Sequence, residues 1–391
     1  MKSRIWLSLA HMSGREQEFI QEAFDTNWVV PLGPNVNAFE KSLRDFLIGD
    51  GGLQIENEGM RIVALSAGTA ALHLGLILLG VQPGDEVICQ SVTLAASANP
   101  IAYLEATPVF VDSEKETWNM DPVLLEEAIK ERLEKTGKLP KAIIPVHLYG
   151  MPGKMDEVME VANCYGIPVL EDSAEALGSE YKGRKCGTFG EYGVLSFNGN
   201  KMITTSGGGA LICPNEEKAK RALFYATQAR EQAPHYQHEK IGYNYRMSNI
   251  CAGIGRGQMF VLDEHVTRRR AIHDLYVKLL AGVKGVKVMC QPEGEGFNSN
   301  YWLTCITVEP EEAGFTREDV RLALDEENIE SRPLWKPMHL QPVFKDAPYY
   351  GNGTSERLFE IGLCLPSGPT LTDEDVERVT KVVKQLSDFR F

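Results

Sequence analysis

The sequence predicts an α/β protein whose main sheet is mostly parallel. Short, continuously apolar runs recur through the first two-thirds of the chain, and helical stretches separate most of the early ones. Strands that are apolar along their whole length are typical of a parallel sheet covered by helices on both faces. A third observation, a long helical pattern that starts near residue 248, predicts a link to a smaller second domain.

Seven candidate strands make up the predicted main sheet. In chain order they are residues 61–66, 86–90, 108–112, 142–146, 167–172, 193–197 and 209–213. The helical stretches between the early strands are residues 69–79, 122–136 and 155–165. Open sheets of this kind bind ligands at the carboxyl ends of their strands. Asp172 stands at such an end.

The helical pattern after Ser248 or Asn249, either of which can cap it, is expected to join the large domain to a carboxyl-terminal one. The predicted elements of that domain are strands near 284–290, 301–309 and 329–335 and helices at 316–327 and 372–386. We therefore predict three segments: 1–30, whose helix at 14–25 packs on the small domain; 31–250, the large domain; and 251–391, the linking helix and small α+β domain. The polar, glycine-rich residues 49–60 predict an exposed loop.

Composition excludes several classes of protein. The chain has 391 residues, of which 43% are hydrophobic and 24% charged, as in ordinary globular proteins. Its net charge of −14, without a basic block, argues against a nucleic-acid partner. The longest apolar stretch, residues 70–81, is too short to span a membrane. The eight cysteines form no CxxC pair, which favours reduced thiols in a cytoplasmic protein.

Asp172 and Lys201 form the most informative pair of residues. Asp172 ends one predicted strand, and Lys201 follows another in a loop that begins at Asn198. Pyridoxal phosphate (PLP) chemistry needs such a pair, because the amine forms a Schiff base with the aldehyde and the carboxylate keeps the pyridine nitrogen protonated. Lys201 could then move a proton between two carbons, which is the central step of transamination. Glu175 lies within reach of the ring's edge; alternatively, this acidic string caps a helix.

A phosphate cradle is predicted at the turn after residues 61–66. Gly68 and Thr69 open a helix there, and small residues at such a turn let backbone N–H groups approach a phosphate at the positive end of the helix. Ser196, five residues before Lys201, could add a hydroxyl donor. The simpler alternative is that Thr69 only caps the helix.

Two further segments carry candidate substrate residues. Residues 227–249 place His235, His238 and Lys240 among tyrosines and arginines. The histidine spacing resembles that of a metal site, but no carboxylate or cysteine cluster completes one, so we predict no metal. A surface for a phosphate-bearing sugar is favoured, and a subunit interface is the alternative. Arg332 and Trp335 are candidates in a turn-rich segment, where Trp335 could equally be a core aromatic.

The motifs together resemble one enzyme family over essentially the whole chain. The most specific are SAGTAALH, EDSAEALGS, SFNGNKMITTSGGG, TQAREQAPHYQH, GYNYRMSN and RPLWKPMH. They are similar to those of the StrS/DegT-type sugar-nucleotide aminotransferases, which are fold-type I PLP enzymes. The last several are most similar to the bacillosamine-pathway enzymes that aminate UDP-4-keto-6-deoxy-N-acetylglucosamine at carbon four with L-glutamate as donor.

This resemblance implies a role for each candidate residue. Lys201 would be the Schiff-base lysine of a ping-pong reaction and Asp172 the partner of the pyridinium nitrogen. Gly68, Thr69 and Ser196 would hold the phosphate, and Glu175 would lie near the ring hydroxyl. In a homodimer, Asn244 would reach the phosphate of the other subunit's cofactor. The sugar-nucleotide site would be lined by His235, His238, Lys240, Arg332 and Trp335. Leu94 stands where the family usually has an aromatic residue that stacks on the PLP ring.

Other functions remain open from the sequence. One is an aminotransferase that acts at carbon three of a keto-sugar, and another is a regulatory member that binds PLP without turnover. A dehydratase of the same fold is disfavoured because such enzymes carry histidine in place of Lys201. An NAD-dependent enzyme is disfavoured because SAGTAALHLG has the wrong glycine spacing for the dinucleotide fingerprint.

Overall fold

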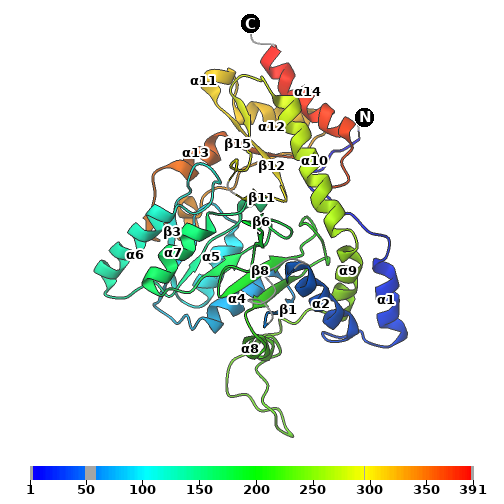
Figure 1. Cartoon of the computed structure of the whole chain (residues 1–391), viewed down its shortest axis with the longest axis vertical. Coiled ribbons are helices and arrows are strands. Elements are labelled where there is room, and N and C mark those ends of the chain that lie inside the picture. The colour runs from blue at the N-terminus through cyan, green and yellow to red at the C-terminus, as the bar shows by residue number, and fades with distance from the viewer. Residues whose placement is uncertain (1–2, 49–58, 295, 389–391) are drawn as a thin grey trace.

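The computed structural model describes residues 3–48, 59–294 and 296–388. Figure 1 shows a larger part built on a central sheet and a smaller part above it, connected by the long helix α10 (Leu262–Leu280). The predicted loop at 49–60 lies almost wholly outside the described residues. No helix of the described chain has both the length and the apolar character needed to cross a membrane.

All seven predicted strands of the main sheet are present. They are β1 (Arg61–Leu65), β2 (Glu86–Gln90), β3 (Thr107–Val111), β4 (Ala142–Ile144), β5 (Leu170–Asp172), β8 (Tyr192–Ser196) and β9 (Gly209–Cys213). Two four-stranded sheets, β14-β3-β2-β4 and β5-β8-β9-β1, meet through parallel bridges between residues 143 and 169 and between residues 146 and 172. Only β9 runs antiparallel to its neighbours. The predicted class, a mainly parallel α/β sheet, is confirmed.

The eighth strand, β14 (Tyr349–Tyr350), was not predicted. It pairs with the edge strand β3, although it comes from the segment assigned to the small domain. Two residues are too few to show a strand pattern in the sequence. Asp112 explains why the chain returns to this edge. Its carboxylate accepts hydrogen bonds from the Tyr349 hydroxyl and from the N–H groups of Asn352, Gly353 and Ser355.

Helices cover the sheet; those near 69–79, 122–136 and 155–165 were predicted from the sequence, and those at 95–103 and 216–226 were not. They are α4 (Gly68–Leu78), α5 (Ala95–Tyr103), α6 (Pro122–Thr136), α7 (Met155–Tyr165) and α8 (Glu216–Ala226). Helix α6 shows why its bounds were predictable. The Asp121 side chain accepts from the N–H groups of Val123 and Leu124, Pro122 occupies the first turn, and Gly137 ends the helix with φ 72°. Helix α4 is buried on nearly every face, since it packs between β9, α5 and α8.

The predicted linking helix is divided in two. Ser248 caps α9 (Asn249–Met259) by accepting from the Cys251 N–H, and α10 follows after a short break at residues 260–261. The prediction that the amino-terminal helix packs on the small domain is wrong for α1 (Glu16–Asp25), which packs along α9. Glycines in α9 permit this approach, because a Cβ at Gly257 would lie 2.8 Å from the Glu16 backbone. The segment before α1 does reach the small domain, where Ile5 pairs with Ile329.

The small sheet is antiparallel and has the order β10-β12-β15-β13. Its strands are β10 (Val286–Val288), β12 (Thr304–Val308), β13 (Arg332–Pro333) and β15 (Gly362–Leu365). Helices α10, α12 (Arg317–Glu326) and α14 (Asp373–Asp388) pack together on it around a separate apolar core. The remaining elements are α2 (Pro34–Ile48), α11 (Pro310–Ala313), α13 (Thr354–Ile361), η1 (Leu148–Gly150), η2 (Met338–Leu340), η3 (Pro342–Phe344) and a small sheet of β6 (Glu180–Tyr181), β7 (Arg184–Lys185) and β11 (Phe297–Asn298).

Candidate active site

A cavity of about 260 Å³ lies at the carboxyl ends of the central strands. Its walls come from the turns after β1, β2, β5 and β8, as expected for an open parallel sheet. Seven of the predicted site residues line it: Gly68, Thr69, Leu94, Asp172, Glu175, Ser196 and Lys201. The structure therefore brings the predicted cofactor residues together, except for Asn244.

Lys201 is buried in this cavity and forms an ion pair. Its Nζ lies 2.9 Å from Oε1 of Glu175, and the two side chains are only 5% and 4% exposed. The other carboxylate oxygen of Glu175 accepts the backbone N–H of Tyr149 at 2.8 Å. Burial raises the pKa of Glu175, although the Lys201 charge opposes the shift. No helix follows the acidic string at 171–175, so the alternative of a helix cap for this string is wrong.

Asp172 faces the same cavity from the last position of β5. Its Oδ2 accepts the Ser97 hydroxyl at 2.6 Å, and its Oδ1 accepts the Ala174 N–H at 3.1 Å. Thr93 in turn contacts the Ser97 hydroxyl at 2.6 Å. These partners fix the orientation of the carboxylate. A carboxylate held in this way can present charge to a cationic ring without reorganising.

The predicted phosphate cradle lies at the start of α4. Helix α4 begins at Gly68, and no side chain caps it, so the alternative role of Thr69 as the cap is wrong. The first N–H groups of a helix have no partner within the helix and favour an anion. Two glycines make the cradle compact: a Cβ at Gly68 would lie 3.1 Å from Cβ of Ser196, and a Cβ at Gly209 would collide with the backbone of Gly68.

An aromatic wall beside Lys201 was not predicted as a unit. The Lys201 Nζ lies 4.3 Å from the centre of the Trp302 ring, within range of a cation–π contact. Tyr149 lies beside Trp302, and its ring centre is 4.7 Å from that of Trp335. Its hydroxyl also accepts the Trp335 N–H at 2.9 Å. Trp302 and Tyr149 belong to distant segments without a local motif, so only the fold could reveal them.

Leu94 lines the cavity at the start of α5 and is 41% exposed. An aliphatic side chain of this size is open to the cavity at the position where the family resemblance implies an aromatic one.

The remaining candidates lie away from the cavity of their own chain. His235, His238, Lys240 and Asn244 are exposed on the segment between α8 and α9. Figure 1 shows this segment as a long loop that projects below α8, away from the rest of the molecule. Arg332 is exposed on β13 and pairs with Glu330 at 2.9 Å. Of the predicted sugar-binding residues, this chain alone therefore brings only Trp335 near Lys201, through Trp302.

A second buried cluster contains His147, Glu171 and Cys186. Nε2 of His147 lies 2.7 Å from Glu171, while Nδ1 accepts the Gly153 N–H. Both ring nitrogens are therefore already used in hydrogen bonds. Hydrogen bonds from His147 and from backbone N–H groups outweigh burial and lower the pKa of Glu171. The cluster braces β5 directly beside Asp172.

The cavity fits a phosphorylated aldehyde with a basic ring. It offers an amine for the aldehyde, a carboxylate for the ring nitrogen, and a helix N-terminus with nearby hydroxyls for the phosphate. Ser196 approaches Gly68 closely at that end, and Gly209 packs against the same backbone, so a side chain at either glycine would crowd the start of α4. These properties match the donor set that PLP requires.

Comparison with known proteins agrees with this geometry. A model of the DegT/DnrJ/EryC1/StrS aminotransferase family matches residues 11–384. EpsN of Bacillus subtilis (strain 168), named as a pyridoxal phosphate-dependent aminotransferase, is 50% identical over 99% of this chain and 96% of its own. GDP-perosamine synthase of Escherichia coli O157:H7 is 36% identical over 96% of each chain. The crystal structure of the aminotransferase TlmJ from Streptoalloteichus hindustanus superimposes with a TM-score of 0.87 at 30% identity, covering both chains completely.

Proposed function

This chain belongs to the DegT/DnrJ/EryC1/StrS aminotransferase family, and from that premise we propose its substrates and its site residues. It is a PLP-dependent sugar aminotransferase. We propose that it moves an amino group from L-glutamate to carbon four of a UDP-linked 4-keto-6-deoxy-N-acetyl sugar, in two half-reactions that alternate at one site. The observation that supports this most directly is Lys201, buried in one cavity with Asp172 and the α4 N-terminus.

The proposed roles follow from the contacts of each side chain. When bound, PLP supplies an aldehyde and a ring that withdraws electrons from the attached carbon. Lys201 takes a proton from the α-carbon of glutamate and, in the second half-reaction, delivers one to carbon four of the sugar. Glu175 holds the amine of Lys201 in position at 2.9 Å. Asp172, whose orientation is fixed by Ser97, would hold the proton on the ring nitrogen.

The N–H groups of Gly68 and Thr69, with the Ser196 hydroxyl, hold the phosphate in this proposal. Leu94 covers one face of the ring by apolar contact. The stacking contribution of an aromatic residue, about 0.5–1.5 kcal/mol, is then absent. The aromatic wall of Tyr149, Trp302 and Trp335 supports Lys201 from the core side.

A homodimer with shared active sites is part of the proposal. The projecting segment carries two strongly exposed apolar side chains, Tyr236 at 74% and Ile241 at 85%, which favour burial against another surface. In a dimer the same segment could deliver Asn244 to the phosphate of the other subunit, and His235, His238 and Lys240 to its sugar site. Light scattering at several protein concentrations tests this; a stable monomer would contradict it.

The choice of sugar depends on the HYQH and RPLW segments, which resemble those of 4-aminotransferases. A GDP-linked sugar is the alternative that GDP-perosamine synthase suggests. Action at carbon three, or PLP binding without turnover, are further alternatives. The PLP-loaded enzyme should be incubated with glutamate and a panel of UDP- and GDP-linked 3- and 4-keto sugars, and the products identified. An amine formed only at carbon three, or only on GDP sugars, would contradict the proposed substrate.

We also propose a cytoplasmic location. All eight cysteines are free thiols, and five of them are buried. Thiols that remain unpaired suit a reducing compartment.

A further inference from the structure

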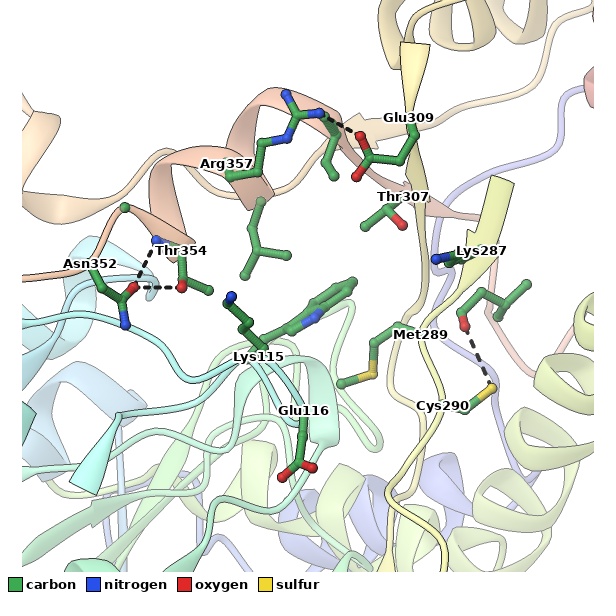
Figure 2. Close-up of a pocket in the computed structure, with 15 residues that line it drawn as sticks. Lys115, Glu116, Lys287, Met289, Cys290, Thr307, Glu309, Asn352, Thr354 and Arg357 are labelled. Carbon is green, nitrogen blue, oxygen red and sulfur yellow. Dashed lines mark hydrogen bonds and ion pairs between the residues drawn. The ribbon is translucent and has the colours of Figure 1, made fainter. Parts of the chain in front are cut away.

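A second, larger cavity opens between the two parts of the molecule. It measures about 640 Å³ and shares no lining residue with the cavity around Lys201. Figure 2 shows its walls: Lys115 rises from the loop after β3, Lys287 and Met289 come from the small sheet, and Arg357 comes from α13. We call it the interdomain cleft. Its size is that of pockets that hold small organic ligands.

The acidic groups that line the interdomain cleft are ion-paired. Glu309 pairs with Arg357, and Glu116 pairs with Lys154 outside the cleft. Their cations are shared: Arg357 also pairs with Glu360 at 2.8 Å, and Lys154 also lies 3.6 Å from Glu114. Lys115 and Lys287, by contrast, have no acidic partner among the residues that the structure describes. They stand on opposite walls, so each raises the electrostatic potential at the other. A chain with net charge −14 repels anions overall, and two facing lysines without acidic partners in the described chain are a local exception.

Asn352 adds an oriented donor to the two lysines. Its Oδ1 accepts both the N–H of Thr354, at 3.0 Å, and the Thr354 hydroxyl, at 2.6 Å. These two bonds fix the plane of the amide, and its Nδ2 has no hydrogen-bond partner among the described residues. The polar groups that remain available in the cleft are therefore mainly donors. A ligand that complements them must be rich in acceptors.

We propose that the interdomain cleft binds a small organic phosphate with at least two negative charges. Lys115 and Lys287 contact the phosphate oxygens from opposite sides, and Asn352 donates a third hydrogen bond. Lysine, a compact charge with three donors, suits a tetrahedral phosphate. The organic part lies on the apolar floor formed by Trp118, Leu358 and Ile361. An inorganic ion alone would leave most of the volume unfilled.

The cleft is connected to the active site through one layer of side chains. Trp118 and Met289 line the cleft and also a very small inner cavity, on whose other side lies Tyr149. Tyr149 donates its N–H to Glu175, the partner of Lys201. Because its walls belong to both parts of the molecule, an occupied cleft would hold the small sheet against the loop after β3.

Two exposed cysteines allow a direct test. Cys290 lines the cleft, whereas Cys164 is exposed on α7 outside it. Alkylation of the PLP-loaded enzyme by N-ethylmaleimide should be followed at both thiols by peptide mass spectrometry, with UDP, pyrophosphate or inorganic phosphate present. Only protein with an empty cleft reacts at Cys290. UDP at ten times its Kd should therefore lower the alkylation rate of Cys290 about tenfold and leave the alkylation rate of Cys164 unchanged. An unchanged Cys290 rate with every phosphate would overturn the proposal.

Variants that reverse the charge of the cleft lysines test whether these lysines cause the protection of Cys290. The double variant Lys115→Glu/Lys287→Glu should lose the protection of Cys290, and the nearby exposed Lys284→Glu should keep it. The single variant Lys287→Ala replaces the double variant if its circular dichroism shows unfolding. Protection that persists in the cleft variants would overturn the lysine assignment. Protection by inorganic phosphate as strong as that by UDP would overturn the organic class of ligand.

Discussion

The Lys201 cavity and the interdomain cleft differ in whether their charged side chains are buried and paired. Around Lys201, each ionisable side chain is buried and held: Lys201 by Glu175, Glu175 by the Tyr149 N–H, and Asp172 by Ser97. In the interdomain cleft, Lys115 and Lys287 are exposed and lack acidic partners in the described chain. Buried, paired groups are oriented before a ligand arrives, as catalysis requires. Exposed lysines are weakly ordered and screened by salt, which suits reversible capture of an anion.

The largest expected effect is on Lys201. Lys201→Ala should lower turnover by at least about 10²–10⁴-fold, because the group that moves the proton is removed. The fold should survive, since Glu175, whose pKa is already raised by burial, can take up a proton in place of its partner. Product formation and circular dichroism measure the two effects, and Lys284→Ala is the matched control. Full activity in Lys201→Ala would contradict the assigned role.

The cradle at the α4 N-terminus should be the next most sensitive point. Gly209→Ala would force a methyl group into the backbone of Gly68 and should lower the unfolding free energy by about 1–3 kcal/mol. Gly207→Ala is the control, because a Cβ there meets no atom within 4 Å. Urea unfolding compares the two variants. Equal stability would show that the cradle can widen.

The Lys201 cavity should also shape the pH dependence of stability. Because burial raises the pKa of Glu175 above its ordinary 4.5, the folded chain keeps this proton to higher pH than the unfolded chain does. The protonated Glu175 carboxyl contributes its full stability below pH 4.5, and this contribution is lost as pH rises through the folded-state pKa. The free energy of unfolding then falls by at most about 1.4 kcal/mol per pH unit. Glu175→Gln should remove this slope. Parallel curves for wild type and variant would contradict the assignment.

The projecting segment offers a prediction that connects one subunit with the other. Asn244→Asp should weaken PLP retention about fivefold, because a negative charge about 4 Å from the phosphate costs about 1 kcal/mol in water. The neutral substitution Asn244→Gln should weaken PLP retention less than Asn244→Asp does. Cofactor release during dialysis, followed by absorbance, measures both. If both variants retain the cofactor as well as wild type, Asn244 is only a turn residue.

The smallest effect is expected in the interdomain cleft. Lys287→Ala removes an exposed, unpaired side chain and should change the unfolding free energy by less than about 0.5 kcal/mol. Thermal unfolding without phosphate measures this. A larger loss would mean that Lys287 supports the fold, and the contrast between the two cavities would then be weaker than proposed.

Local sequence was sufficient to predict which residues gather around Lys201. Asp172 and Glu175 share one turn, and Ser196 and Lys201 share another, so strand ends and short spacings already placed them near one another. The sequence was also sufficient for helix α6, whose cap, first-turn proline and final glycine are all local signals. The seven strands of the main sheet followed from their continuous apolar character, because burial on both faces leaves a direct trace in composition.

Only the tertiary structure could place the rest. Trp302 meets Lys201, and Tyr149 meets Glu175 and Trp335, across long sequence separations that no motif records. Helix α1 packs on α9 because glycines in α9 allow the two backbones to approach closely. Strand β14 pairs with the main sheet because Asp112 accepts hydrogen bonds from the turn that follows β14. The interdomain cleft is assembled from the loop after β3, two strands and α13. Such sites depend on how elements distant in the sequence pack together, whereas a motif depends only on residues that are close together in the sequence.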